Sequence, residues 1–269
     1  MEDTRAKARD AKSGERETGT LGKAMAVLDI VASSNQPLRF TDILLKSDQP
    51  RGTLHRQISN LVEEGLLAVN RDHSYELGMT LLKFAARAWA GNHFRAIAEP
   101  HLARLHEETG ETVHLGVLRG TEVIYLDKVE GRQAVRMYSQ IGNASPVYCT
   151  GVGKAAMSAL PPERIEALVN TINFRKFTDH TITTPRALIA ELADIRAAGV
   201  AYDREEHELG IRCVAAPIWS NDGNFHAGVS VTGPAYRVTF EALDAWKMLV
   251  LRTAQGIMAD METRLGPRA

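Results

Sequence analysis

Apolar side chains in the first quarter of the chain recur every three or four positions, which is the spacing of amphipathic helices. The first such run covers positions 21–33 and reads LGKAMAVLDIVAS. Two shorter runs follow between Phe40 and Leu67. Their apolar positions are Ile43, Leu44, Leu54, Ile58, Leu61 and Val62. The pattern predicts one helix followed by a close pair of short helices.

A polar break separates the two short helices. It reads KSDQP and ends at Pro50, which cannot continue a helix interior because proline has no backbone N–H. We expect Thr41 to cap the first helix of the pair, since its hydroxyl can accept an unpaired backbone N–H. The second helix is expected over 51–64, where Gly65 suits the left-handed residue that ends a helix. Two helices joined in this way form a helix-turn-helix.

A short β-hairpin is predicted directly after the helix pair. Leu66–Val69 and Ser74–Leu77 are strand-like, and the polar residues 70–73 form the turn between them. A hairpin in this place is the wing of a winged helix-turn-helix. An ordinary helical hairpin with a solvated outer face is the alternative, but the short polar turn and the immediate wing disfavour it.

The winged helix-turn-helix predicts binding of duplex DNA. In this motif the N-terminal half of the second helix enters the major groove, where polar side chains reach base edges and phosphates. The apolar positions of that helix point inward, which leaves its polar positions for DNA. The expected DNA-contacting residues are Arg39, Thr41, Arg51, Gly52, Thr53, His55, Arg56, Gln57, Asn60 and Arg71.

Composition limits how the protein can bind DNA. The chain has 269 residues, a formal net charge of −1, 44% hydrophobic and 24% charged residues. These values are typical of a two-domain globular protein and exclude a uniformly basic nucleic-acid binder. DNA affinity must therefore come from a local basic patch, multiplied by oligomerisation.

The cysteine content and the lack of targeting segments indicate where the protein is expected to be located. Cys149 and Cys213 are the two cysteines, too few for a disulfide framework and without zinc-finger spacing, so a cytoplasmic location is expected. No apolar run is long enough to span a bilayer, and the N-terminus lacks a signal peptide's apolar core. Residues 1–19 are mostly charged or polar and are predicted to form a disordered tail.

A second helical region follows the wing. Residues 80–96 are predicted to form a linker helix, which divides a DNA-binding domain (20–79) from a C-terminal domain (97–269). Pro100 is expected to bend or restart the helical region. The linker helix carries an apolar stripe that could be intramolecular core or a dimer contact. The stripe consists of Leu81, Leu82, Phe84, Ala85 and Trp89.

The apolar period changes to two at Thr112, which predicts strands. The predicted strands cover 112–118, 122–129, 133–141, 213–219 and 225–232. Helices are expected to start near Thr150, Pro161 and Thr184, and a long one covers about 239–264. Strands and helices that come in runs indicate an α+β domain.

Four stretches resemble the IclR family of bacterial transcriptional regulators. They are PRGTLHRQISNLVEEGLL, PVYCTGVGKAAMSALP, YDREEHELGIRCVAAPI and GVSVTGP. The resemblance covers about residues 20–266 and implies a winged helix-turn-helix, a linker helix and a C-terminal effector-binding domain of GAF-like fold. It also implies dimers that pair into tetramers. VRMYSQIGNASPVYCTGVGK is most similar to the branch that senses 2-keto-3-deoxygluconate.

Thr150–Lys154, with the sequence TGVGK, is placed at a strand-to-helix junction. The free N–H groups and the dipole of a helix start favour an anion, and glycines let it approach closely. A small carboxylate is the expected guest. A phosphate-binding P-loop is excluded, because its first glycine would fall at Tyr148 and its last hydroxyl at Ala155.

The family resemblance implies how the effector is held. One carboxylate would accept hydrogen bonds from the backbone N–H groups of Gly151 and Val152, and other side chains would complete the pocket. The implied pocket residues are Met137, Gly151, Val152, Asp203, Cys213, Ser230 and Thr232. Relatives often carry alanine at Val152 and serine at Thr232. Most of the charged run 203–208 is expected to be a solvated loop, and its spacing does not suggest a metal site.

The expected function is a transcriptional regulator, with repression favoured, controlled by a small carboxylic or keto acid such as 2-keto-3-deoxygluconate. Aromatic-acid or glyoxylate-type effectors are the alternative. The expected partners are a pseudo-palindromic operator and further copies of the chain, with no cofactor, metal or membrane. An enzyme using Cys213 with His207 and Asp203 is a remote alternative, because no G-x-S-x-G elbow or helix start is obvious near Cys213. An oligomerising scaffold that binds no ligand is the third possible function.

Overall fold

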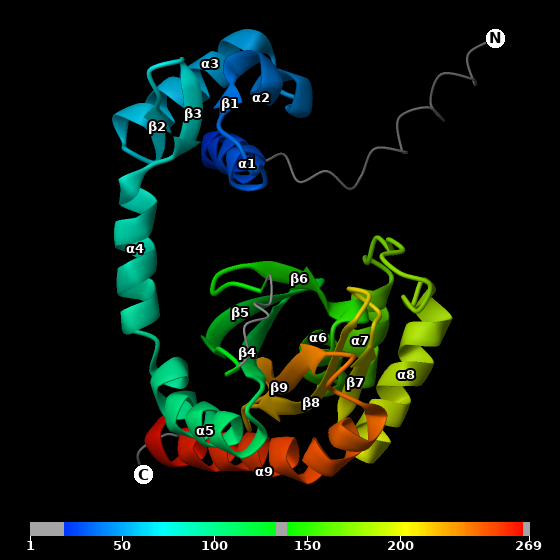
Figure 1. The fold of residues 1–269 in the computed structure, drawn as a ribbon. Coiled ribbons are helices and arrows are strands. Elements are labelled where there is room, and N and C mark those ends of the chain that lie inside the picture. Colours follow the sequence, from blue (N-terminus) through cyan, green and yellow to red (C-terminus); the bar gives the residue numbers. More distant parts are fainter. Residues whose placement is uncertain (1–18, 133–138, 266–269) are drawn as a thin grey trace, which may run out of the picture. The chain divides into compact units, whose positions relative to one another are not determined.

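The computed structural model describes residues 19–132 and 139–265. The chain forms two compact units that meet in sequence between Gly91 and Asn92 (Figure 1). A helix-turn-helix unit precedes an α+β unit, which confirms the predicted fold class. The expected tail, residues 1–19, lies outside the described residues except for its last position. None of the described helices combines the length and apolar character needed to cross a bilayer.

Three helices form the core of the first unit: α1 (Thr20–Ala32), α2 (Phe40–Lys46) and α3 (Arg51–Glu63). Their apolar stripes meet in one cluster, because residues three and four apart share a helix face. The buried members are Val27, Leu28, Val31, Leu38, Ile43, Leu54, Ile58, Leu61 and Leu67. The spacing of apolar residues therefore predicted this core correctly.

The wing is a three-stranded sheet. Strands β2 (Leu67–Val69) and β3 (Ser74–Leu77) form the predicted hairpin, and Gly65 before them has the expected positive φ of 68°. A third strand, β1 (Leu38–Arg39), pairs with β3. Two residues are too few for a visible alternation, so the sequence did not predict β1.

The start of α2 differs from the prediction. Its N-cap is Arg39, and the Asp42 carboxylate accepts a hydrogen bond of 2.9 Å from the Arg39 backbone N–H. Thr41 was wrongly assigned as the cap. It lies inside the first turn and is exposed. A carboxylate at the third position of a helix can accept a hydrogen bond from the backbone N–H of the N-cap residue. Asp42 does this here, and the Thr41 hydroxyl does not act as the cap.

The expected linker helix over 80–96 is shorter in the structure. Helix α4 (Met79–Ala90) ends at Gly91, and α5 (His93–Thr109) begins with Asn92, whose side chain accepts a 2.9 Å hydrogen bond from Arg95 N–H. The helix therefore restarts at Asn92. Pro100 lies inside α5 on an exposed position and does not restart it.

The described residues of the second unit form an antiparallel sheet of six strands in the order β6-β5-β4-β9-β8-β7 (Figure 1). The strands are β4 (Thr112–Arg119), β5 (Glu122–Val129), β6 (Ala144–Pro146), β7 (Ala201–Arg204), β8 (Ile211–Trp219) and β9 (His226–Pro234). The predicted hairpins β4–β5 and β8–β9 are confirmed. Of the expected strand 133–141, residues 133–138 lie outside the described part, and the remaining three are not in a strand.

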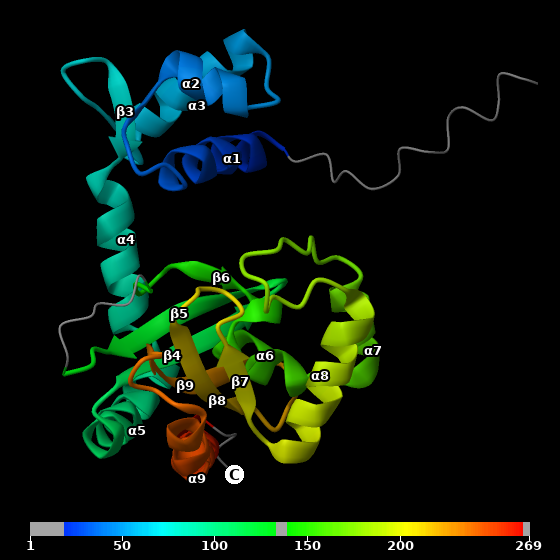
Figure 2. The ribbon, with the colours of Figure 1, turned by 45° about the vertical axis from the view of Figure 1, so that its right-hand side comes forward.

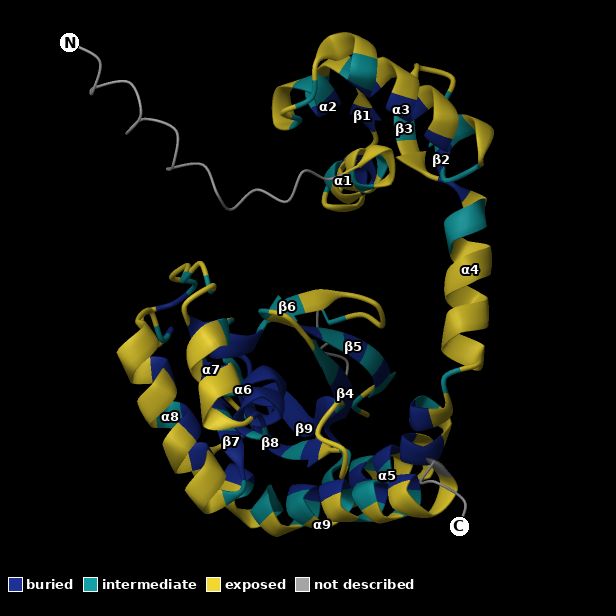
Figure 3. Cartoon of the chain, turned by 180° about the vertical axis from the view of Figure 1, so that it is seen from behind, coloured by how far each residue is buried: buried dark blue, intermediate teal, exposed yellow. Residues whose placement is uncertain are grey.

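Helices cover both faces of this sheet (Figure 2). One face packs against α5 and α9 (Phe240–Leu265), whose apolar residues share a core with β4, β8 and β9. The other face carries α6 (Gly151–Ser158), with α7 (Pro162–Val169) and α8 (Pro185–Ala198) outside it. Helix α6 is buried at every position (Figure 3), which makes it the central element on its side of the sheet.

Candidate functional site

The outer face of α3 presents most of the residues expected to contact DNA. Arg51, His55, Arg56 and Asn60 are exposed, and Thr53 is half-buried. Gly52 is exposed, with open space where a side chain would stand. Arg39, Thr41 and Arg71 are exposed on neighbouring elements of the same unit. The exposed residues of this set include four arginines, at positions 39, 51, 56 and 71.

Gln57 does not belong to this surface. It is 2% exposed, and it lies on the buried stripe between Leu54 and Leu61. Those two positions are three residues before and four after it, so helical geometry turns Gln57 inward. The assignment of Gln57 as a DNA contact was therefore wrong.

Phe40 contacts two of the side chains that were expected to bind DNA, a role that the sequence analysis missed. The Arg51 guanidinium carbon lies 5.4 Å from the centre of the Phe40 ring. The His55 ring lies 6.0 Å from the same ring, centre to centre. Contacts between α2 and α3 depend on how the helices cross, so the spacing along either helix could not show them.

The second unit contains a cavity of about 250 Å³ between the sheet and the start of α6. Every residue expected in the effector pocket lines it except Met137, which lies outside the described residues. The lining residues are His114, Tyr125, Ser139, Asn143, Ala144, Ser145, Thr150, Gly151, Val152, Asp203, His207, Glu208, Ile211, Cys213, Ser230 and Thr232. Strands distant in sequence supply them, because the register aligns β5, β4, β9, β8 and β7 side by side.

The N-terminus of α6 forms one wall of the cavity. The helix begins at Gly151, and the side chain of its N-cap residue, Thr150, makes no capping hydrogen bond. The Thr150 hydroxyl donates instead to the Pro146 carbonyl at 2.9 Å. A Cβ atom on Gly151 would collide with Cys213 Sγ, so glycine is required where the helix approaches β8. The free N–H groups and the helix dipole make this wall suited to an anion.

Asp203 and Cys213 face each other across strands β7 and β8 on this wall. Burial, together with the nearby Glu206 charge, raises the pKa of Asp203 to about 7. Burial also raises the pKa of Cys213 to about 12, and the Asp203 charge adds to the effect. Contrary to expectation, a helix N-terminus does lie beside Cys213, yet its thiol stays protonated. This argues against Cys213 as a nucleophile, because the thiolate is the reactive form.

The opposite side of the cavity is formed by β4 and β5. His114 Nε2 lies 2.7 Å from Ser139 Oγ, and its Nδ1 lies 3.3 Å from Thr232 Oγ1. Burial lowers the pKa of His114 to about 3, with a further contribution from the Lys128 charge, so the ring is neutral. The Tyr125 ring packs 5.0 Å from it. Sequence analysis missed His114, although a histidine between Val113 and Leu115 is a polar break in an apolar strand.

A β-bulge brings Tyr125 into the cavity. Tyr125 pairs with Gly116 and Asp127 pairs with Leu115, which leaves Leu126 as the extra residue of β5. A bulge reverses the alternation of side chains. Asp127 therefore faces α5, where Arg95 Nη1 donates to it at 3.0 Å.

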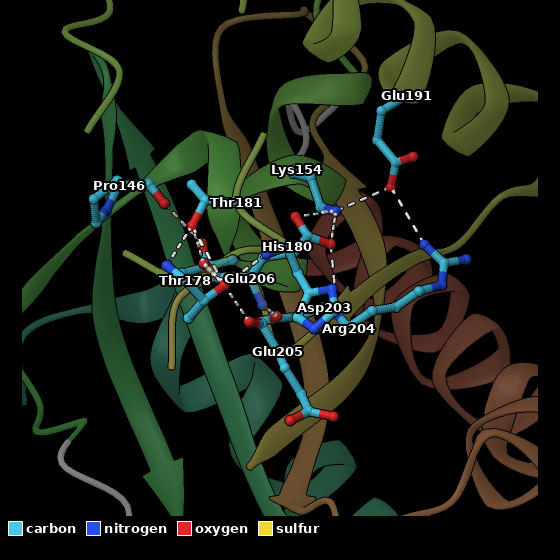
Figure 4. Close-up of polar contacts among 11 residues, drawn as sticks. Pro146, Lys154, Thr178, His180, Thr181, Glu191, Asp203, Arg204, Glu205 and Glu206 are labelled. Carbon is cyan, nitrogen blue, oxygen red and sulfur yellow. Dashed lines mark hydrogen bonds and ion pairs between the residues drawn. The ribbon is translucent and has the colours of Figure 1, made fainter. Parts of the chain in front are cut away.

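A buried ion cluster stabilises the loop after β7 (Figure 4). Lys154 is fully buried, and its Nζ lies 2.6 Å from Glu206 Oε1 and 2.9 Å from Glu191 Oε1. Burial opposes its charged form, but the two carboxylates outweigh this and raise the pKa of Lys154. Thr181 Oγ1 donates to the Glu206 carbonyl at 2.6 Å. The cluster orders the loop whose next residues, 207 and 208, line the cavity.

The charged run 203–208 therefore differs from the solvated loop that was expected. Asp203 and Glu206 are buried, and Asp203 belongs to strand β7. Glu205 and His207 are half-buried. The sequence of this run did not show that Lys154 of α6 pairs with Glu206, or that Glu191 of α8 joins them. Within the described ranges, no group of three or more His, Cys, Asp or Glu could hold a metal ion.

Comparisons with known protein families match most of the chain. A model of the "IclR helix-turn-helix domain" matches residues 20–71. A model of the "Bacterial transcriptional regulator IclR C-terminal" matches residues 87–259.

Curated relatives agree with the family models. The HTH-type transcriptional regulator BhcR of Paracoccus denitrificans is 33% identical over 245 residues, which cover 91% of this chain and 88% of BhcR. The HTH-type transcriptional regulator KdgR of Escherichia coli is 27% identical over 240 residues, with 89% and 91% covered.

Solved structures share the fold. The IclR of Thermotoga maritima superposes with a TM-score of 0.67 at 32% identity, covering 92% of this chain and 99% of that one. An IclR homologue from Microbacterium hydrocarbonoxydans, crystallised with 4-hydroxybenzoate, has a TM-score of 0.72 at 25% identity and covers 91% and 99%.

Proposed function

Because this chain belongs to the IclR family of bacterial transcriptional regulators, we propose that it binds operator DNA through α3. A small carboxylate that occupies the cavity beside α6 is proposed to change its affinity for that DNA. The family consists of DNA-binding regulators, many of them repressors, and repression is the proposed mode here. One observation carries the effector part of the proposal. The uncapped start of α6 opens into a polar cavity within the unit that follows the DNA-binding unit.

DNA recognition is proposed for the exposed residues of α3. Arg51, His55 and Arg56 project from its N-terminal half, with Phe40 supporting the first two. A helix placed in this way can put its first turns into the major groove while Arg39 and Arg71 reach phosphates. Gln57 is excluded from this surface by its burial.

The effector is proposed to be a small acid whose carboxylate accepts hydrogen bonds from the first N–H groups of α6, at Gly151 and Val152. A cavity of about 250 Å³ suits a compact metabolite. The 4-hydroxybenzoate complex of the solved relative supports an aromatic acid as one candidate. The resemblance of VRMYSQIGNASPVYCTGVGK to the sugar-acid branch supports 2-keto-3-deoxygluconate as another. KdgR is 27% identical to this chain and BhcR is 33% identical, so overall similarity does not favour one effector over the other.

Oligomerisation is proposed through α4. No residue of this helix is buried, and Met79, Leu82 and Phe84 are 75%, 60% and 57% exposed. An exposed apolar stripe of this kind marks an interface with another protein surface. A second copy of the chain would place two recognition helices on one duplex, as pseudo-palindromic operators require.

Two measurements test the proposal. Operator DNA selected from random duplexes should bind the full-length protein with an affinity that falls steeply as salt rises, because phosphate contacts release counterions. A thermal-shift panel of pyruvate, 2-keto-3-deoxygluconate and aromatic acids should raise the melting temperature for at least one acid. DNA affinity that does not change with salt would argue against the DNA-binding surface. A panel in which no acid raises the melting temperature would argue against the effector site.

A further inference from the structure

The cavity has two chemically different sides, and the difference limits which acids can fill it. We propose that His114 and the hydroxyl groups beside it read an uncharged polar group of the effector, so that the cavity selects monocarboxylic acids with a hydroxyl or keto group and rejects dicarboxylic acids of the same length. This inference rests on the proposed function, since it assumes that the start of α6 holds the first carboxylate.

The charges around the cavity provide the first argument. Among the described lining residues there is no lysine or arginine, whereas Asp203 and Glu208 are acidic. The only cationic feature of the described wall is the start of α6, which suits a single carboxylate. Lys154 lies behind that wall, with its ammonium group held by Glu206 and Glu191. The described lining therefore offers a second carboxylate no cation to pair with.

The β4–β5 side of the cavity is polar but uncharged. The neutral His114 ring joins the hydroxyls of Ser139 and Thr232, and Thr232 Oγ1 lies 3.5 Å from Ser230 Oγ. A neutral imidazole has one donor and one acceptor nitrogen, and each hydroxyl can donate or accept. Such a group can reorient to match a ligand hydroxyl or carbonyl. A buried carboxylate would also need a cationic partner, because an unpaired charge in a desolvated site is costly.

Lys128, a described cation on that side, is not available to a ligand. Lys128 Nζ donates to the Ser139 carbonyl at 2.8 Å and lies 2.9 Å from Glu130 Oε1. Its side chain is 6% exposed. Its charge therefore acts on His114, which it helps to keep neutral, and does not line the cavity.

The sheet register sets the length of the ligand. His114 pairs with Ser230, Thr232 pairs with Cys213, and Cys213 pairs with Asp203 beside the start of α6. His114 on β4 and Cys213 on β8 are thus two strand spacings apart, roughly 10 Å between backbones. An acid of about four to six carbons, with its second polar group at the far end, would reach from Gly151 to His114.

Matched acids test the proposal by isothermal titration with the full-length protein. One pair is 4-hydroxybutanoate and succinate, and the other is gluconate and glucarate. In each pair, the second acid has a carboxylate where the first has a terminal CH₂OH group. We expect at least one hydroxy acid to bind roughly tenfold or more tightly than its dicarboxylate partner. A dicarboxylate that binds as tightly would overturn the selectivity while leaving the effector site intact. If none of the four acids bound although an acid of the thermal-shift panel did, the selectivity would fail and the effector site would stand.

Variants at His114 separate recognition from folding. His114→Asn, which keeps a neutral donor and acceptor, should preserve the affinity ratio of the better pair within about threefold. His114→Leu should reduce that ratio at least threefold, with the hydroxy acid weakened more than its partner, because the far-end hydrogen bonds are lost. His226→Asn is the matched control, since His226 is also buried in the sheet but does not line the cavity. An unchanged ratio in His114→Leu, with operator affinity retained, would exclude His114 as the specificity residue.

Discussion

At the scale of single residues, we expect Asp203 to make binding of the proposed effector depend on pH. Its pKa of about 7 means that the carboxyl is largely neutral at pH 6 and largely negative at pH 8. A negative Asp203 would repel an anionic effector at the neighbouring start of α6. We therefore expect affinity for the effector to rise as pH falls from 8 to 6, by at most about tenfold per pH unit, the limit for one coupled proton. Titration calorimetry in two buffers would measure the proton uptake.

Other groups around Asp203 do not titrate in the same way. Cys213 has a pKa of about 12, the pKa of Lys154 is raised, and burial lowers the pKa of His207. Burial also raises the pKa of Glu206, so it is the one neighbour that could share the proton. Asp203→Asn should remove the pH dependence, and a variant that keeps it would assign the proton to another group.

Arg56 and Gln57 are adjacent in sequence and offer a matched test of the DNA-binding surface. Arg56 is exposed and Gln57 is buried. Arg56→Ala should weaken operator binding by about 1–3 kcal/mol and change the free energy of unfolding by roughly 0.5 kcal/mol or less. Gln57→Ala should instead lower the free energy of unfolding. Fluorescence anisotropy and chemical denaturation measure the two effects, and the reverse result would contradict the assigned orientation of α3.

At the scale of elements, the contact between α6 and β8 depends on a glycine. Gly151→Ala would place a methyl group against Cys213 Sγ. Overpacking of this kind costs about 1–3 kcal/mol of stability. Cys213→Ala in the same chain should restore part of the loss, because it removes the colliding sulfur. Thermal unfolding of the single and double variants would show the recovery, and strictly additive losses would disprove the contact.

Helix α4 provides the prediction for assembly. Leu82→Glu combined with Phe84→Glu should shift the protein toward monomers and weaken operator binding, because both side chains are exposed in the single chain. Lys83→Glu is the control, since it adds an acidic group to the same helix without removing apolar surface. Sedimentation velocity would give the molecular mass. A double variant with the parent's mass would exclude α4 from the interface.

At the scale of the whole molecule, DNA and effector must affect each other equally. If the effector changes operator affinity by a given factor, operator DNA must change effector affinity by the same factor. Coupling of this kind is typically about 5–150-fold. Measuring effector binding with and without operator DNA would check this. Unequal factors would show that further species, such as other oligomers, take part.

Local patterns and tertiary structure contributed differently to these conclusions. The sequence by itself determined the helix-turn-helix, the wing, both hairpins of the large sheet and the start of α8 near Thr184. Each of these rests on residues close together in the chain, such as an apolar period, a turn or a proline, and is therefore visible locally. The family resemblance named Gly151, Asp203, Cys213, Ser230 and Thr232, and the structure places them around one cavity.

Only the tertiary structure decided what lies between distant segments. It buried Gln57, set Phe40 beneath Arg51, paired Lys154 with carboxylates from other elements and brought His114 opposite the start of α6. The register of five antiparallel strands and the bulge at Leu126 determine which side chains share a face. A one-residue shift in register would turn those side chains to the other face, and no local pattern specifies it.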